Sequence, residues 1–184
     1  MIDSLYSEIA AFRPLCEQEQ RDREQMLRCI EQYDNILLRD NDLVHMTASA
    51  WIVNPQRDRV LMVYHNIYKA WSWVGGHADG DPDLCAVALR EAREETGLAH
   101  LTLAQEGIFS LESVCVLPHV KRGSYVSSHI HLNATYLFLA RESEPLRHKP
   151  DENSAVAWLD REQSVGQCPE AHMIPIYSKL WARL

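Results

Sequence analysis

Three glutamates near the middle of the chain, Glu91, Glu94 and Glu95, have a spacing that would gather their carboxylates on one face of a helix. Like charges at this spacing repel one another, and the repulsion grows where water is excluded. Hard divalent cations prefer clustered carboxylate oxygens, and Mg²⁺ usually takes a few of them together with substrate phosphates. Arg90 can reach Glu94, but one arginine does not balance three carboxylates. The spacing therefore favours a metal site, and the alternative is a solvated helix surface with Arg/Glu pairs.

Local chemistry predicts where this helix begins and ends. Asp81 is expected to be the N-cap, and Pro82 suits the first helical position because its missing N–H costs nothing there. Asp83 adds negative charge at the positive end of the helix dipole. Gly97 can end the helix in a left-handed conformation. The face that carries the glutamates is apolar in its first two turns, at Leu84, Val87 and Ala88.

The stretch from Gly76 to Leu98 resembles the Nudix box, G-x5-E-x7-R-E-U-x-E-E-x-G-U, in which U is aliphatic. The matching residues are Gly76, Arg90, Glu91, Ala92, Glu94, Glu95, Gly97 and Leu98. Pro82 stands where the box has its first glutamate. Asp81 or Asp83 is the candidate to take over the role of that glutamate beside the arginine.

The resemblance implies a hydrolase that uses Mg²⁺ or Mn²⁺ to cleave the pyrophosphate bond of a nucleoside diphosphate linked to another moiety. By analogy with the family, Glu91, Glu94 and Glu95 would bind the metal, joined by the Gly76 carbonyl. Arg90 would orient the glutamates through charge-assisted hydrogen bonds. Metal ions at such a site offset phosphate charge and lower the pKa of the attacking water.

A second acidic position lies in a loop late in the chain, where Asp151 and Glu152 precede a short predicted strand, AVAWLD. Many Nudix proteins have an acidic residue in this loop that helps to hold metal or activate water. The resemblance therefore implies a catalytic role for Glu152. The general base stays open between Glu152 and the box glutamates.

Candidate substrate-binding residues lie on both sides of the box. Trp71 precedes the glycines and is interpreted as a wall of the substrate pocket, although a core position is the alternative. Lys121 and Arg122 form a basic cluster in the loop PHVKRGSYVSS of an otherwise acidic chain. They are candidates for phosphate contacts, and a solvated hairpin tip is equally consistent with this pattern.

His129 and His131 alternate with apolar residues along a predicted strand, so they share one face with Asn133 and Thr135. A His-x-His pair on a strand can ligate a transition metal. No third ligand at a convincing spacing accompanies the pair, so we interpret both histidines as polar lining of the substrate cleft.

The order of predicted elements indicates an α/β fold. Residues 1–43 are predicted to form an N-terminal helical extension, with one helix ending at Pro14 and another from about Cys16 to Tyr33. This extension either packs on the main domain or contributes to a dimer. Residues 44–184 are predicted to form the Nudix hydrolase domain. It would contain a hairpin from Val44, the box helix, strands at 107–117 and 129–140, and a helix from about Pro169, which fits a mixed sheet in an α/β/α sandwich.

Composition limits the partners of the chain. With a net charge of −8, the chain lacks the basic surface that general nucleic-acid binding requires. No apolar run is long enough to span a membrane, and the first residues do not read as a signal peptide. The five widely spaced cysteines suggest reduced thiols. We expect a cytoplasmic enzyme with a small-molecule diphosphate substrate, and a homodimer is left open.

Two other classes of function remain to be weighed. A nucleotide-sensing Nudix-like module would have no need of the glutamate cluster, yet all three glutamates are present. A prenyl-diphosphate isomerase on the same fold would require a reactive cysteine in the active site, and no cysteine here has a context that assigns it that role.

Overall fold

The computed structural model of this protein describes residues 2–121 and 123–184, and their contacts group into two compact units. The first unit consists of Met1–Ala48, Gly76–Val87 and Gly107–Thr135. The second unit consists of Ser49–Gly75, Ala88–Glu106 and Tyr136–Leu184. Within the described residues, no helix combines the length and apolar character needed to cross a membrane.

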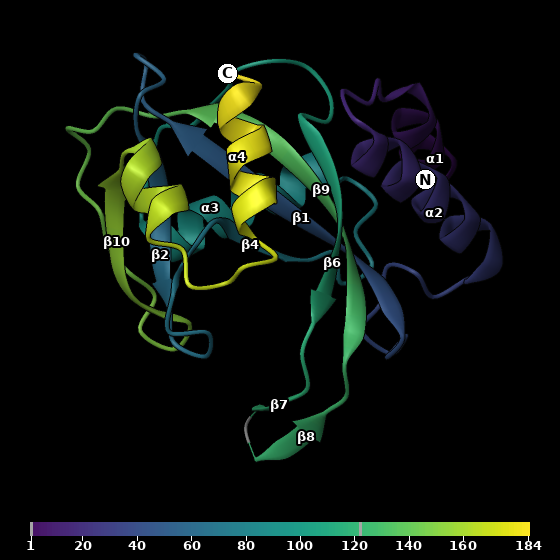
Figure 1. The fold of residues 1–184 in the computed structure, drawn as a ribbon. Coiled ribbons are helices and arrows are strands. Elements are labelled where there is room, and N and C mark those ends of the chain that lie inside the picture. Colours follow the sequence, from purple (N-terminus) through teal and green to yellow (C-terminus); the bar gives the residue numbers. More distant parts are fainter. Residues whose placement is uncertain (1, 122) are drawn as a thin grey trace. The chain divides into compact units, whose positions relative to one another are not determined.

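Two helices open the first unit, α1 (Ile2–Ala11) and α2 (Glu17–Gln32), as the sequence predicted. They pack on one another, and α2 packs on strand β6 (Ser110–Val116) (Figure 1). Polar contacts fix this docking: Gln18 Nε2 donates to the Leu111 carbonyl at 3.0 Å, and the Ser113 N–H donates to the Asp22 carboxylate at 2.9 Å. The predicted domain boundary after residue 43 stays a prediction.

Strand β6 pairs antiparallel with the first part of β9 (His129–Leu139), in a register that places Ser110 opposite Thr135 and Val116 opposite His129. Strand β6 begins at Ser110 and not at Gly107, because the chain turns at Gly107 with a φ of +74°. Beyond β6, the short strands β7 (His119–Lys121) and β8 (Ser124–Val126) form a hairpin. This hairpin extends away from β6 and β9 in Figure 1.

The predicted polar face of β9 is confirmed inside the first unit. Asn133 accepts a hydrogen bond from Thr47 Oγ1 at 3.1 Å and donates to Thr135 Oγ1 at 3.0 Å. Thr135 in turn donates to Glu112 at 2.9 Å. These side chains are buried, so the polar face continues into the interior as a hydrogen-bonded network.

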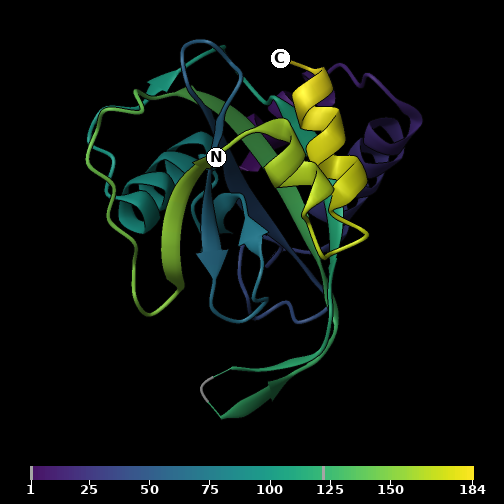
Figure 2. The same ribbon diagram turned by 60° about the vertical axis from the view of Figure 1, so that its left-hand side comes forward.

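The strands follow the order β10-β2-β1-β9-β5, and the second unit includes β1 from Ser49 and β9 from Tyr136. Their bounds are β1 Val44–Val53, β2 Val60–His65, β5 Thr102–Leu103 and β10 Asn153–Leu159, with β3 (Trp71–Ser72) paired to β2. Strands β1 and β2 form the predicted hairpin, and β10 lies antiparallel beside β2 (Figure 2). The Ala140 N–H bonds to the Val53 carbonyl, and the Ile130 N–H bonds to the Leu43 carbonyl. This common order along both strands makes β1 and β9 parallel, so the predicted mixed sheet is confirmed.

The chain ends with a π-helical turn, η1 (Glu162–Gly166), and helix α4 (Ile174–Ala182). The prediction that this helix starts near Pro169 is wrong. Pro175 lies in the first turn of α4, the place in a helix where a fixed φ and a missing N–H are tolerated. Tyr177 of α4 is fully buried and lies 5.8 Å, between ring centroids, from Trp73. Trp73 is half-buried and packs against this buried tyrosine of the second unit.

Candidate functional site

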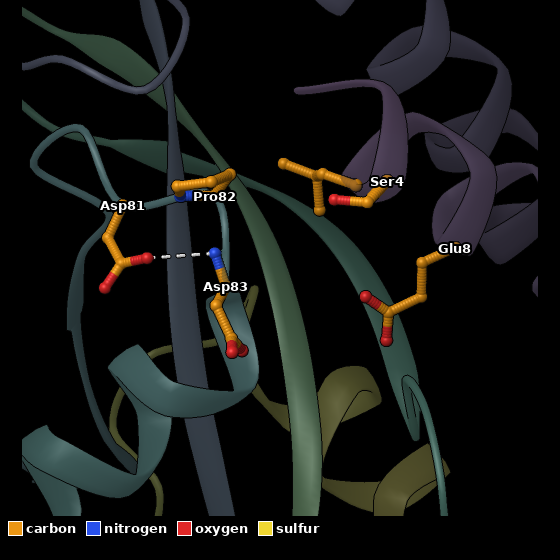
Figure 3. Close-up of a pocket in the computed structure, with 6 residues that line it drawn as sticks. Ser4, Glu8, Asp81, Pro82 and Asp83 are labelled. Atoms are coloured by element: carbon orange, nitrogen blue, oxygen red, sulfur yellow. Dashed lines mark hydrogen bonds between the residues drawn. The ribbon is translucent and has the colours of Figure 1, made fainter. Parts of the chain in front are cut away.

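Helix α3 (Leu84–Thr96) carries the three glutamates, and Asp83 is its N-cap. Asp83 Oδ1 accepts from the Ala86 N–H at 2.9 Å, and the Asp83 carbonyl accepts from Val87 at 3.0 Å. The prediction of Asp81 as the N-cap and Pro82 as the first helical residue is wrong. Asp81 Oδ1 accepts from the Asp83 N–H at 3.0 Å (Figure 3), which closes a turn before the helix and delays its start.

A pocket of about 510 Å³ lies beside this turn in the first unit. It is lined by Ser4, Leu5, Glu8, Asp81, Pro82 and Asp83 (Figure 3). The two aspartates are engaged in the capping turn, and none of the matching charged residues of the box lines the pocket. The pocket therefore offers no set of groups for diphosphate chemistry.

The other end of α3 is fixed by Gly97. Its φ is +74°, and its N–H bonds to the Arg93 carbonyl at 3.0 Å. A Cβ at this position would lie 2.9 Å from Arg147 Cβ. Only glycine meets both the conformation and the close approach, which accounts for its place in the box.

In the second unit, Glu91, Glu95 and Glu152 form a carboxylate cluster, with one ligand oxygen from each residue within 4.8 Å of the others. Glu91 and Glu95 come from one face of α3, and Glu152 comes from the loop before β10. Glu95 is only 4% exposed, and its Oε1 accepts from the Gly75 N–H at 3.1 Å. The structure therefore brings Glu152 to two of the three box glutamates.

Burial and mutual repulsion perturb the carboxylate cluster. Burial raises the pKa of Glu95 to about 8, and the charges of Glu152 and Glu91 act in the same direction against the hydrogen bond from Gly75. Burial also raises the pKa of Glu91, with Glu94 and Glu152 adding to the effect. Clustered carboxylate oxygens are the ligands that hard divalent cations prefer, so the donor set of Glu91, Glu95 and Glu152 fits Mg²⁺ or Mn²⁺.

Lys149 is a site residue that sequence reasoning missed. Its Nζ lies 3.1 Å from Glu152 Oε1 and 3.3 Å from Glu94 Oε2. Burial lowers the pKa of Lys149, but its hydrogen bonds to Glu152 and Glu94 outweigh that effect and raise it. Lys149 therefore holds Glu94 in an ion pair outside the carboxylate cluster and orients Glu152. The only signal in the sequence was its place three residues before Glu152.

The loop that carries Glu152 is itself anchored by backbone bonds. The Glu152 N–H donates to the Lys149 carbonyl at 2.9 Å, and the Glu152 carbonyl accepts from the Asn66 N–H at 2.9 Å. Asn153 Nδ2 donates to the Glu95 carbonyl at 3.3 Å and so ties this loop to the end of α3. These bonds fix the position of Glu152 relative to the helix.

Arg90, the arginine of the box, lies close to one of the glutamates. Its Nε is 4.0 Å from Glu91 Oε1, the outer limit of an ion pair. Trp71 lies on β3, with its ring edge-on to Tyr64 at 5.5 Å between ring centroids.

Gly76 of β4 (Val74–His77) belongs to the first unit, and its role as a metal ligand stays a prediction. The backbone of Lys121 lies in β7, and Arg122 is outside the described residues.

His129 and His131 lie side by side on β9, with their Nε2 atoms 3.1 Å apart. His45 of β1 and His77 of β4 join them in the first unit, and each of these two has its ring centroid 4.9 Å from that of His131. Sequence reasoning missed both added histidines and therefore found no third partner for the pair.

Three of the thiols have a raised pKa, which makes them less reactive. Burial raises the pKa of Cys85 to about 11, with Asp83 and Glu8 adding to the effect. Burial also raises the pKa of Cys29 and of Cys168. None of these three residues is a ready nucleophile at neutral pH, which speaks against the prenyl-diphosphate isomerase alternative.

Comparison with known proteins agrees with the fold. The family model described as the NUDIX domain matches residues 43–179. A Caenorhabditis elegans Ap4A hydrolase in a binary complex superposes with a TM-score of 0.56 at 18% identity, over 74% of this chain and 95% of that chain. The Escherichia coli dihydroneopterin triphosphate pyrophosphohydrolase gives 0.56 at 15% identity, over 76% and 96%. A Clostridium perfringens hydrolase of the NUDIX family gives 0.54 at 20% identity, over 75% and 96%. A search of curated proteins found no match.

Proposed function

This chain belongs to the Nudix family and is a pyrophosphohydrolase, and from that premise we propose that it uses a divalent metal to cleave a nucleoside diphosphate linked to another moiety. The observation that supports the proposal is the carboxylate cluster, in which Glu91, Glu95 and Glu152 present oxygens within 4.8 Å of one another. Burial, with the charges of Glu152 and Glu91 adding to it, raises the pKa of Glu95 to about 8, and perturbed pKa values of this kind are typical of functional sites.

Glu91, Glu95 and Glu152 would hold the metal. Glu94 would join them by leaving its ion pair with Lys149 and binding the metal instead. The Gly76 carbonyl is the further ligand that the family pattern suggests. When bound, Mg²⁺ or Mn²⁺ supplies charge compensation for the phosphate oxygens and lowers the pKa of a water molecule. An all-oxygen donor set of this kind suits Mg²⁺ and Mn²⁺ better than softer ions.

We assign different roles to the carboxylates of this site: Glu95 is a fixed metal ligand, and Glu152 takes part in proton transfer. Hydrogen bonds from Gly75 and Asn153 hold Glu95 and its backbone in place, which suits a fixed ligand. The Glu152 side chain is 43% exposed, against 17% for Glu91, so attacking water reaches it most easily. Glu152 would accept the proton of that water, and Lys149 would orient its carboxylate. Arg90 would act on Glu91 through charge.

The substrate class rests on the family and on its structural relatives. The C. elegans and E. coli proteins are named for Ap4A and for dihydroneopterin triphosphate, and both compounds join a phosphoanhydride to a heterocycle. Trp71 is the proposed stacking wall for such a ring, and Lys121 and Arg122 are the proposed phosphate contacts.

The test is a release assay for phosphate and nucleotide over a library of nucleoside diphosphate derivatives. It compares wild type, Glu91→Gln and the matched control Glu106→Gln, which changes an exposed glutamate of the second unit. We expect turnover with Mg²⁺ or Mn²⁺ in wild type and the control, and little with Glu91→Gln. If no compound is turned over with either ion, the proposed activity is wrong. If Glu91→Gln keeps full activity on a substrate, the site assignment is wrong.

A further inference from the structure

Four histidines meet in the first unit, and we call them the histidine cluster: His45, His77, His129 and His131. One ring nitrogen from each of His45, His77 and His131 lies within 4.8 Å of the others. His129 adds its Nε2 at 3.1 Å from His131 Nε2. The ring centroids of His45 lie 4.9–5.2 Å from those of the other three. No other residue type contributes to this set of nitrogens.

Three neighbouring strands build the histidine cluster. The Ala78 N–H, just after β4, bonds to the Met46 carbonyl of β1 at 3.1 Å. The Ile130 N–H of β9 bonds to the Leu43 carbonyl, just before β1, at 2.9 Å. Adjacent strands lie about 4.8 Å apart, so side chains on a common face of such strands come within ligand distance of one ion.

The tautomers of two members are set by backbone carbonyls. His45 Nδ1 lies 2.8 Å from the Asn41 carbonyl, and His129 Nδ1 lies 2.8 Å from the Ser127 carbonyl. Because a carbonyl only accepts, each Nδ1 must carry the proton, and each Nε2 is left with a lone pair. This arrangement is the usual support for a metal-bound imidazole.

His45 Nε2 is the atom in the histidine cluster whose surroundings point to a bound metal ion. The side chain is 4% exposed, and its Nε2 is buried without a hydrogen-bond partner among the described residues. An unsatisfied buried polar atom costs about 1–3 kcal/mol, so native structures rarely leave one without a reason.

We propose that His45, His77, His129 and His131 bind one divalent transition-metal ion, with Zn²⁺ as the reference species. Imidazole nitrogen suits Zn²⁺ and its neighbours in the first transition row, and not Mg²⁺. Two nitrogens of a tetrahedral zinc site lie roughly 3.3 Å apart, given Zn–N bonds of about 2.0–2.1 Å. The 3.1 Å between His129 and His131 Nε2 already matches that spacing. The nitrogens of His45, His77 and His131 lie within 4.8 Å of one another, so each separation must shorten by about 1.5 Å at most to meet it.

The histidine cluster belongs to the first unit and offers neutral nitrogen ligands, whereas the carboxylate cluster belongs to the second unit and offers anionic oxygen ligands. The protein would therefore bind two kinds of metal ion, a hard ion through oxygen and a borderline ion through nitrogen. The proposal stands whether or not the assigned diphosphate activity is found, because its test measures zinc and not turnover.

The experiment uses the full chain without a histidine tag, stripped of metal with a chelator and then dialysed. Zn²⁺ is titrated by calorimetry with Mg²⁺ in excess, and Co²⁺ is added separately so that its visible spectrum reports coordination number. We expect one Zn²⁺ per chain and a tetrahedral Co²⁺ spectrum. His131→Asn and His77→Asn should each weaken Zn²⁺ binding at least about tenfold. The control His172→Asn changes an exposed histidine of the second unit and should bind as wild type.

Two further arms keep the test decisive. Circular dichroism checks each variant for folding, and His77→Asn, at a half-buried position, decides the result if His131→Asn does not fold. Glu91→Gln should retain the wild-type affinity for Zn²⁺. Unchanged Zn²⁺ binding in a folded His77→Asn variant overturns the proposal. Loss of the ion in Glu91→Gln also overturns it, because zinc would then be bound by the carboxylates.

Discussion

The carboxylate cluster and the histidine cluster are two solutions to the same geometric problem. Each brings three ligand atoms within 4.8 Å of one another. The carboxylate cluster takes two of its three members from adjacent turns of α3, whereas the histidine cluster takes its members from β1, β4 and β9. A helix turns neighbours in sequence into neighbours in space, and a sheet joins residues that are far apart in the chain.

The clusters also lack different things. The carboxylates repel one another, and burial raises the pKa of Glu95 and of Glu91. The histidines are a set of rings in which His45 Nε2 has no hydrogen-bond partner among the described residues. A cation would therefore stabilise the carboxylate cluster by neutralising charge, and a metal ion would stabilise the histidine cluster by accepting the lone pair of His45 Nε2. This contrast predicts different responses to the same perturbation.

The largest effect is expected from Glu95→Gln. Glu95 is the most buried member of the carboxylate cluster and accepts a hydrogen bond from the Gly75 N–H, so its replacement removes a preorganised metal ligand. We expect kcat to fall about 10²–10³-fold with Mg²⁺, in the range seen when one electrostatic group is removed from an active site. Steady-state kinetics on the substrate found by the library assay measure this. Zinc affinity should not change, and a parallel loss of zinc would break the distinction between the clusters.

Much of the carboxylate cluster could be predicted because its information is local. The three glutamates Glu91, Glu94 and Glu95 lie within helix α3, and the whole resemblance to the Nudix box lies within one short stretch, from Gly76 to Leu98. The sequence did not show that Glu94 pairs with Lys149 while Glu152 takes its place in the cluster. That exchange depends on how the 149–153 loop folds onto α3.

The histidine cluster could not be predicted, and strand pairing explains why. His129 and His131 were visible as a pair, but His45 and His77 lie 84 and 52 residues before His129. Nothing in local spacing shows that β1 contacts both β4 and β9.

The wrong prediction of the first residue of α3 has a different cause. Asp81 and Asp83 are both suitable N-cap residues by type, and only the hydrogen bond from the Ala86 N–H to Asp83 identifies Asp83 as the N-cap.

The pH dependence of stability tests the charge on the carboxylate cluster directly. In metal-free protein the folded pKa of Glu95, about 8, lies above the ordinary value of 4.5. Between these values the unfolded chain has lost a proton that the folded chain retains, so stability falls as pH rises from 4.5 to 8 and then levels off. The Glu95 contribution is on the order of 5 kcal/mol, from a shift of about 3.5 pKa units at about 1.4 kcal/mol each. Urea unfolding in chelator should show this decline in wild type, and Glu95→Gln should flatten it. An equal slope in both proteins would contradict the assigned origin.

A smaller effect is expected where the end of α3 is fixed. Gly97→Ala forces a side chain into a φ of +74° and brings its Cβ to 2.9 Å from Arg147 Cβ. We expect a loss of about 2–3 kcal/mol in unfolding free energy, together with weaker Mg²⁺-dependent turnover. Gly107→Ala is the matched control, because its φ is also +74° but its nearest atom lies 3.9 Å away. The control should lose only about 1–2 kcal/mol. Equal losses would show that the contact with Arg147 does not matter.

The smallest effect separates the two aspartates at the start of α3. Asp83 accepts from an N–H of the first helical turn, whereas Asp81 accepts only from the Asp83 N–H before the helix. Asp83→Ala should therefore cost about 1 kcal/mol of stability, and Asp81→Ala only a few tenths. Thermal unfolding of both variants beside wild type measures the difference. Both substitutions should leave zinc affinity unchanged, because strand pairing and not the start of α3 holds the histidine cluster together. A zinc site weakened by Asp83→Ala would show that the two clusters share a support, and the contrast between helix-built and sheet-built sites would then fail.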